Sequence, residues 1–148
     1  MKAKVPTKYF IHADDDSDDR QTVADMIAKI DPVLTVIGVE NGIEVLNYLK
    51  SLDQEDALPC FILLDINMPA MNGFQTLESL KSKDSFKSIP VILFTTSSHT
   101  RDIQLAKRLG AENLITKPFS LQGIGEITKQ FADFCHDLPV RRYETVNH

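Results

Sequence analysis

The residues of this sequence best suited to chemistry are acidic, and they directly follow apolar segments. Asp14 and Asp15 come after the short segment YFIHA at 9–13, and Asp65 follows the run CFILL at 60–64. A carboxylate in such a place is costly to bury unless it is paired or bound to a metal. Three carboxylates brought close together would also repel one another, so without a cation at least one would have a raised pKa.

Two further polar residues follow apolar segments in the same way. Thr95 comes after VILF at 91–94, and Lys117 comes after NLIT at 113–116. Lys117 would supply a positive charge, and Thr95 a hydroxyl donor, for an oxyanion lying between them. Mg²⁺ prefers oxygen ligands and suits a site that also holds water and a substrate phosphate. Because a carboxylate can itself act as the nucleophile, these residues predict a metal-assisted phosphoryl acceptor.

Apolar and amphipathic segments alternate along the whole chain, and they indicate how these residues are positioned. We expect strands at 9–13, 34–39, 60–64, 91–94 and 113–116. We expect helices at 17–30, around 43–49, after Gly73, at 101–109 and from 121 to about 135. Five strands alternating with five helices predict an α/β fold, an open parallel sheet with helices on both faces. In sheets of this kind ligands bind at the carboxyl ends of the strands, which is where the polar residues fall.

Acidic residues are crowded between positions 14 and 19, where five of six residues are Asp. Carboxylates near the amino terminus of a helix are favourable, and this explains Asp16, Asp18 and Asp19 as a solvated helix start capped by Ser17. It does not explain Asp14 and Asp15, which belong to the strand end.

Length and composition are those of one soluble globular domain: 148 residues, 43% apolar and 25% charged. A net charge of −5 argues against direct DNA binding, because neutralising phosphates takes clustered Lys and Arg. No apolar run is long enough to cross a membrane, and no secretory signal is evident, so we expect a cytoplasmic protein. We divide the chain into an extension at 1–7, a domain at 8–135 and a tail at 136–148, with a polar surface loop at 51–59.

The cysteines and histidines give no sign of a metal site. Cys60 and Cys135 lie far apart in the sequence and match no metal spacing, so we expect two unpaired structural thiols. None of the four histidines has a partner at ligand spacing, and we expect His12 to be a hydrogen-bonded core residue.

Four segments, each at a strand end and in the same order, resemble the signature segments of response-regulator receiver domains. They are ADDD at 13–16, LDINMPAMNG at 64–73, FTTS at 94–97 and TKPF at 116–119. Each segment alone is weak evidence for the family. Together they support a resemblance that extends from about residue 8 to residue 134. The resemblance implies a doubly wound, flavodoxin-like sheet of five parallel strands in the order 2-1-3-4-5. Residues 47–49 also resemble, more narrowly, the receivers that serve phytochrome-type kinases.

The resemblance also implies roles for individual residues. Asp65 would be the phosphoacceptor, Asp15 would bind Mg²⁺ directly, and Asp14 would hold it through water or help place it. The backbone carbonyl of Asn67 would complete the protein ligands of the metal.

Further roles and departures concern the last two strands. Thr95 would bond one phosphoryl oxygen and Lys117 would neutralise another, with a cis bond before Pro118 aiming the lysine inward. Leu114 stands where many receivers carry Tyr or Phe, so the aromatic readout of phosphorylation is not expected here. Thr96 is larger than the usual residue and should narrow the approach to Asp65.

The expected partners are a sensor histidine kinase or a histidine phosphotransfer protein, a downstream protein effector and, as one option, a second copy in a homodimer. A magnesium phosphohydrolase is less well supported, because its general acid would stand where Asn67 is. A flavin or nucleotide binder would need a Gly-rich phosphate loop, which is absent after the first strand. The remaining alternative is a receiver-like module that binds proteins without being phosphorylated.

Overall fold

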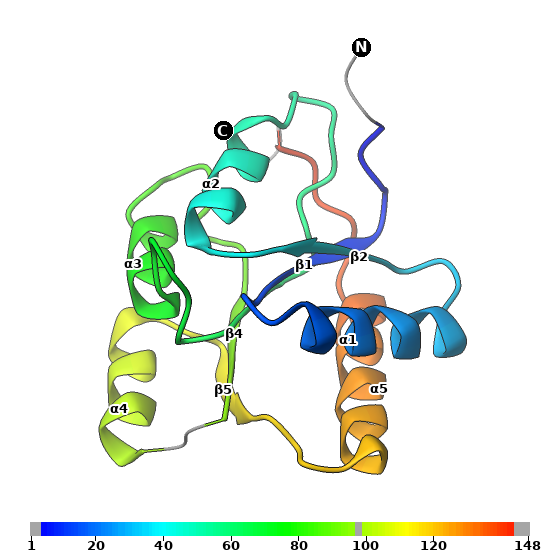
Figure 1. Cartoon of the computed structure of the whole chain (residues 1–148). Helices are drawn as coiled ribbons and strands as arrows, with labels where there is room; N and C mark the ends of the chain where they lie inside the picture. Colours follow the sequence, from blue (N-terminus) through cyan, green and yellow to red (C-terminus); the bar gives the residue numbers. More distant parts are fainter. Residues whose placement is uncertain (1–3, 97–98, 144–148) are drawn as a thin grey trace.

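Strands and helices alternate along the computed structural model, which describes residues 4–96 and 99–143 (Figure 1). The strands are β1 (Tyr9–Ala13), β2 (Thr35–Val39), β3 (Ile62–Leu64), β4 (Val91–Thr95) and β5 (Asn113–Thr116). The helices are α1 (Ser17–Ile30), α2 (Gly42–Lys50), α3 (Gly73–Lys81), α4 (Thr100–Leu109) and α5 (Leu121–Asp137).

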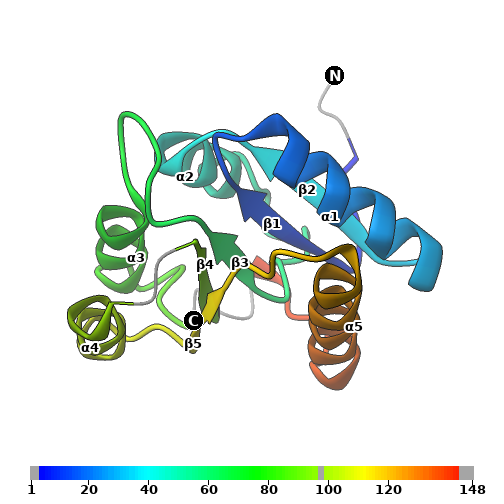
Figure 2. The same cartoon turned by 60° about the horizontal axis from the view of Figure 1, so that its bottom comes forward.

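The five strands form one parallel sheet in the order β2-β1-β3-β4-β5. Helices α1 and α5 cover one face of this sheet, and α2, α3 and α4 cover the other (Figure 2). This arrangement confirms the predicted doubly wound α/β fold. It also brings the carboxyl ends of all five strands to the same edge of the sheet.

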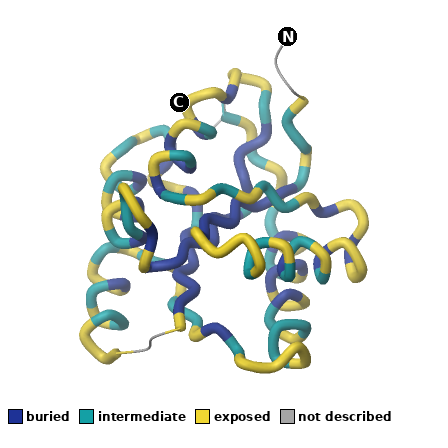
Figure 3. Tube along the Cα trace, in the orientation of Figure 1, coloured by how far each residue is buried: buried dark blue, intermediate teal, exposed yellow. Residues whose placement is uncertain are grey.

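Each face of the sheet packs its own hydrophobic core, and the buried strands run through the centre of the molecule (Figure 3). In β3, Ile62 and Leu64 point to the core under α2, α3 and α4, while Leu63 points to the core under α1 and α5. The second core is aromatic: Phe10 and Phe61 stack with ring centroids 4.5 Å apart. Two fully buried faces explain why β3 reads as a continuous apolar run.

Helix α1 begins in a different way from the one predicted. The side chain of Asp16, not Ser17, caps the helix and accepts hydrogen bonds from the backbone N–H groups of Asp18 and Asp19. Asp and Ser are equally good caps, so the sequence alone does not decide between neighbours.

The two cysteines form a disulfide, so the prediction of unpaired thiols was wrong. Cys60 lies just before β3 and Cys135 lies in the last turns of α5, with Cα atoms 5.4 Å apart. Helix α5 follows β5 and returns along the face of the sheet to the start of β3. A separation of 75 residues hides this proximity in the sequence.

Residues 51–59 are not simply a polar surface loop, because Leu52, Ala57 and Leu58 are buried. The chain after α5 folds back onto them: Leu58 N–H donates to the Arg141 carbonyl at 2.8 Å, and Ala57 forms an antiparallel bridge with Arg142. Among residues 4–96 and 99–143, no helix is both long and apolar enough to cross a membrane.

Candidate functional site

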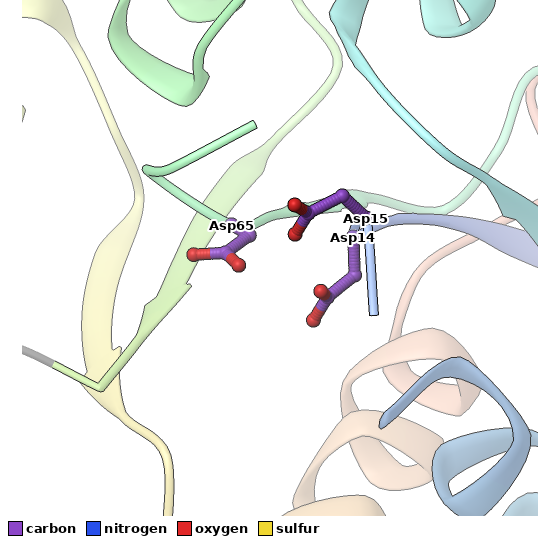
Figure 4. Close-up of side chains that lie close together, drawn as sticks. All are labelled: Asp14, Asp15 and Asp65. Atoms are coloured by element: carbon purple, nitrogen blue, oxygen red, sulfur yellow. The ribbon is translucent and has the colours of Figure 1, made fainter. Parts of the chain in front are cut away.

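Three carboxylates meet at the carboxyl edge of the sheet. Strands β1 and β3 are neighbours, with Ala13 opposite Leu64, so the residues that follow them come together. Each of Asp14, Asp15 and Asp65 offers an oxygen within 4.8 Å of the others (Figure 4). Asp14 is fully buried, Asp65 is nearly so, and Asp15 is exposed. The structure thus brings together the three acids singled out in the sequence.

The ammonium group of Lys117 lies among carboxylates. Its Nζ is 2.7 Å from Asp14 Oδ2, 2.9 Å from Asp19 Oδ2 and 3.3 Å from Asp65 Oδ2. The same atom lies 5.7 Å from the centroid of the Phe94 ring. Burial alone would lower the pKa of Lys117, but the carboxylates of Asp14 and Asp19 raise it above its ordinary value. The side chain is therefore a fixed positive charge.

Strand pairing places Lys117 beside Thr95. Thr95 pairs with Thr116 in the β4–β5 register, and the backbone N–H of Lys117 donates to the Thr95 carbonyl at 2.7 Å. No peptide bond between described residues is cis, so the bond before Pro118 is trans and the cis bond implied by the resemblance was wrong. Lys117 reaches the carboxylates from its backbone position at the end of β5 without that bond.

The two buried carboxylates have pKa values displaced in opposite directions. Burial raises the pKa of Asp65, and the nearby charge of Asp14 adds to this while Lys117 opposes it. Burial also disfavours the charge on Asp14, but His12, Lys117 and the backbone N–H of Asp16 lower its pKa to about 2. Asp14 is thus firmly ionised, while the charge on Asp65 is held less favourably.

A tight loop follows Asp65 and packs closely against its backbone. Gly73 packs against it so closely that a Cβ there would lie 2.4 Å from the Asp65 carbonyl oxygen. The N–H of Gly73 donates to the Ile66 carbonyl at 2.9 Å, and the N–H of Asn67 donates to Asp65 Oδ1 at 3.3 Å. Ala70 adopts a left-handed conformation with φ of 65°, which favours glycine. The role of the Asn67 carbonyl as a metal ligand stays a prediction.

Thr95 and Thr96 occupy different environments. Thr95 is fully buried at the end of β4. Thr96 is exposed and lines a cavity of about 270 Å³, together with Asp19 and Lys117. Thr96 therefore lies near the lysine, while its predicted narrowing of the approach to Asp65 stays a prediction. Ser97, the last residue of the third signature segment, lies outside the described residues.

Sequence reasoning missed three residues around the site. Asp19 was assigned to a solvated helix start, yet its carboxylate pairs with Lys117. Arg20 donates from its guanidinium to the backbone carbonyl of Asp14. The ring of His12 is buried, but neither nitrogen has a hydrogen-bond partner among the described residues, and Nε2 lies 3.7 Å from Asp14 Oδ2. The one available signal was the excess of acid between positions 14 and 19.

The donor set fits a hard divalent cation. The three Asp residues supply only carboxylate oxygens, two of which lie in a buried setting where mutual repulsion is poorly screened. Because Asp15 is exposed, a cation held here would face solvent on one side, which suits Mg²⁺, an ion that usually keeps several waters.

Comparison with known proteins gives a consistent result. Residues 10–129 match the family model of the response regulator receiver domain. Among solved structures, the phosphorylated cyanobacterial phytochrome response regulator RcpA is 27% identical, with a TM-score of 0.79 over 92% of this chain and 99% of that one. A response regulator receiver domain from Rhodospirillum rubrum is 25% identical, with a TM-score of 0.78 over 90% of this chain and 97% of that one.

Curated relatives include both short and long proteins. Chemotaxis protein CheY1 of Helicobacter pylori is 30% identical over 113 residues, which is 76% of this chain and 87% of CheY1. The nitrate/nitrite response regulator NarL of Escherichia coli is 35% identical over 104 residues, but these span 70% of this chain and only 45% of NarL. The shared region is the part of the chain that holds the sheet and the carboxylates, and by this match the chain belongs to the response regulator receiver domain family of two-component signalling.

Proposed function

We propose that this chain accepts a phosphoryl group on Asp65, with Mg²⁺, and signals through altered protein contacts rather than by turning over a substrate. The donor would be a phosphohistidine of a sensor histidine kinase or of a histidine phosphotransfer protein. The convergence of Asp14, Asp15, Asp65 and Lys117 at one edge of the sheet is the observation that carries the proposal. The functional unit would be residues 8–135, although α5 itself continues to Asp137.

Asp65 is the carboxylate best suited to be the nucleophile. Asp14 has one oxygen bonded to the backbone N–H of Asp16 at 2.9 Å and the other to Lys117 at 2.7 Å, and it is fully buried. Asp65 retains some exposure, and its longer contact with Lys117 leaves that oxygen less tightly held. Because the negative charge of Asp65 is less stabilised, its oxygen donates an electron pair to phosphorus more readily.

In the proposed step an oxygen of Asp65 attacks the phosphorus atom, the P–N bond to the donor histidine breaks, and its electron pair stays on the imidazole, which takes up a proton. A bound Mg²⁺ would neutralise charge on the phosphoryl oxygens, held by Asp14, Asp15, Asp65 and the Asn67 carbonyl. Lys117 would neutralise a phosphoryl oxygen, and the hydroxyl of Thr95 would bond another.

A phosphorylation-independent binding module is the second candidate. Leu114 replaces the usual aromatic residue and is half-buried beside a cavity of about 110 Å³ lined by Ile103 and Ala106 of α4. The absence of an aromatic ring at position 114 favours a readout of phosphorylation that does not use such a ring. It leaves the residues of the acceptor site unchanged. A downstream effector and a homodimer are both compatible with such a readout.

The test is incubation with acetyl phosphate, with and without Mg²⁺, followed by intact mass measurement. We expect one added phosphoryl group that requires Mg²⁺ and is absent in Asp65→Asn. Asp133→Asn, the same change at an exposed position of α5, should behave as the wild type. If no protein gains mass, beryllofluoride binding is measured next, and failure of Mg²⁺-dependent binding there would favour the binding module.

A further inference from the structure

Lys117 is shared by three carboxylates, and one of them has no place in the proposed metal site. Asp14 and Asp65 belong to the acids that can hold the cation, whereas Asp19 is not a member of that group. Asp19 nevertheless lies closer to Lys117 Nζ than Asp65 does, at 2.9 Å against 3.3 Å. The phosphoacceptor is therefore the most distant of the three partners of the lysine.

The first turn of α1 holds Asp19 in this place. The backbone N–H of Asp19 donates to the capping carboxylate of Asp16, which fixes the start of the helix. Asp19 is the third residue of α1 and lies in its first turn. Its carboxylate is 41% exposed and lines the cavity on the approach to Lys117, so it lies at the rim of the site.

We propose that Asp19 is a positioning residue that competes with the phosphoacceptor for Lys117 and slows phosphorylation of Asp65. This inference rests on the proposed function. The lysine must neutralise a phosphoryl oxygen once Asp65 is modified, and its ion pair with Asp19 has to be weakened or given up for that. The negative charge of Asp19 at the rim also repels an incoming phosphoryl group, so both effects have the same sign.

The size of the effect follows from the exposure of the pair. Partly exposed ion pairs contribute little because solvent screens them, so we expect removal of the Asp19 charge to raise the rate about two- to fivefold. The effect should shrink at high ionic strength, since screening weakens both the ion pair and the repulsion.

The chain offers a matched control for this charge. Asp18 lies in the same first turn of α1 and is exposed, and it makes no ion pair with Lys117 among the described contacts. Asp18→Asn and Asp19→Asn therefore remove the same charge from the same helix end. Asp19→Glu keeps the charge and serves as the conservative variant.

The experiment measures the initial rate of phosphorylation by acetyl phosphate for the wild type and these three variants at saturating Mg²⁺. The Mg²⁺ concentration at half-maximal rate is measured separately. We expect Asp19→Asn to be about two- to fivefold faster, with Asp18→Asn and Asp19→Glu near the wild type and the Mg²⁺ midpoint unchanged. In a Lys117→Met background the difference between the two Asn variants should shrink to what repulsion alone produces.

Three results would overturn the inference. Equal rates for Asp19→Asn and Asp18→Asn, or a slower Asp19→Asn, would show that Asp19 does not compete for the lysine. A rate change fully explained by a shifted Mg²⁺ midpoint would assign Asp19 to metal binding instead. Phosphorylation of the wild type with equal rates in both Asn variants removes this inference alone. No phosphorylation in any protein, followed by no Mg²⁺-dependent binding of beryllofluoride, removes the proposed function with it.

Discussion

At the residue scale, Asp14 is held by shorter hydrogen bonds than Asp65. Its carboxylate is fully buried and accepts hydrogen bonds from Lys117 and from the backbone N–H of Asp16. These partners, with His12 nearby, outweigh the cost of burial and lower its pKa to about 2 from an ordinary value of 3.8. The unfolded chain therefore binds a proton at Asp14 more readily than the folded protein does.

This difference predicts a pH dependence of stability in the metal-free protein. The stabilisation due to Asp14 is fully present above about pH 4 and is lost as the pH falls through about 2. We expect the free energy of unfolding of the wild type to fall in this window by about 2 kcal/mol more than that of Asp14→Asn. Urea unfolding at several pH values, in the presence of a chelator, measures both. Parallel pH profiles for the two proteins would contradict the prediction.

The sequence revealed the acids at strand ends but not Asp19. Asp14, Asp15 and Asp65 were recognised because a carboxylate directly after an apolar strand is costly to bury and so suggests a functional role. Asp19 suggested no such role, because acids at a helix start interact favourably with the helix dipole. Its contact with Lys117 depends on how α1 packs against α5, the helix that follows Lys117, and no local pattern records that.

At the element scale, the loop between β3 and α3 contains an unfavourable residue. Ala70 has a φ of 65°, a conformation that strains residues with a Cβ. We expect Ala70→Gly to raise the free energy of unfolding by about 0.5–1 kcal/mol, since relief of strain exceeds the entropy that glycine adds to the unfolded chain. Ala28→Gly, in the exposed part of α1, should instead lower it by about 1 kcal/mol. Chemical unfolding of the wild type and both variants measures these changes. Destabilisation by Ala70→Gly would refute the assignment of strain.

Element types were predictable here, and element ends were less so. The run at 60–64 was expected to be strand throughout, but β3 comprises only Ile62–Leu64. Cys60 and Phe61 are apolar for other reasons: one is bonded to Cys135 and the other packs among aromatic rings of the second core. Hydrophobicity marks burial, and it does not distinguish a strand from the packed residues beside it.

At the scale of the whole molecule, the disulfide joins two distant parts of the chain. A crosslink that closes a loop of about 75 residues is expected to stabilise a protein by about 4 kcal/mol, mainly by restricting the unfolded chain. We expect dithiothreitol to lower the urea midpoint of the wild type and to leave a Cys60→Ser, Cys135→Ser double variant unaffected. Equal sensitivity of the two proteins, or two free thiols in the untreated wild type, would contradict this prediction.

The sheet was predictable at this scale, and the covalent link was not. Alternating strands and helices predict a parallel sheet from the sequence, and the family resemblance supplied its strand order. Contact between Cys60 and Cys135, like the return of residues 141–143 onto residues 56–58, depends on the finished three-dimensional arrangement. Neither contact leaves a spacing that can be recognised in advance.

The crosslink also determines how α5 can respond to events at the site. This helix begins four residues after Lys117. Near its other end, Cys135 is bonded to Cys60, which lies just before β3. Its 17 residues make a rod about 25 Å long. Because the disulfide holds one end of this helix, we expect a displacement that starts at Lys117 to be larger near the fully exposed Phe119 than near Cys135. The helix is in mechanical terms a lever, with its fulcrum at the amino edge of the sheet, opposite the edge that holds the carboxylates.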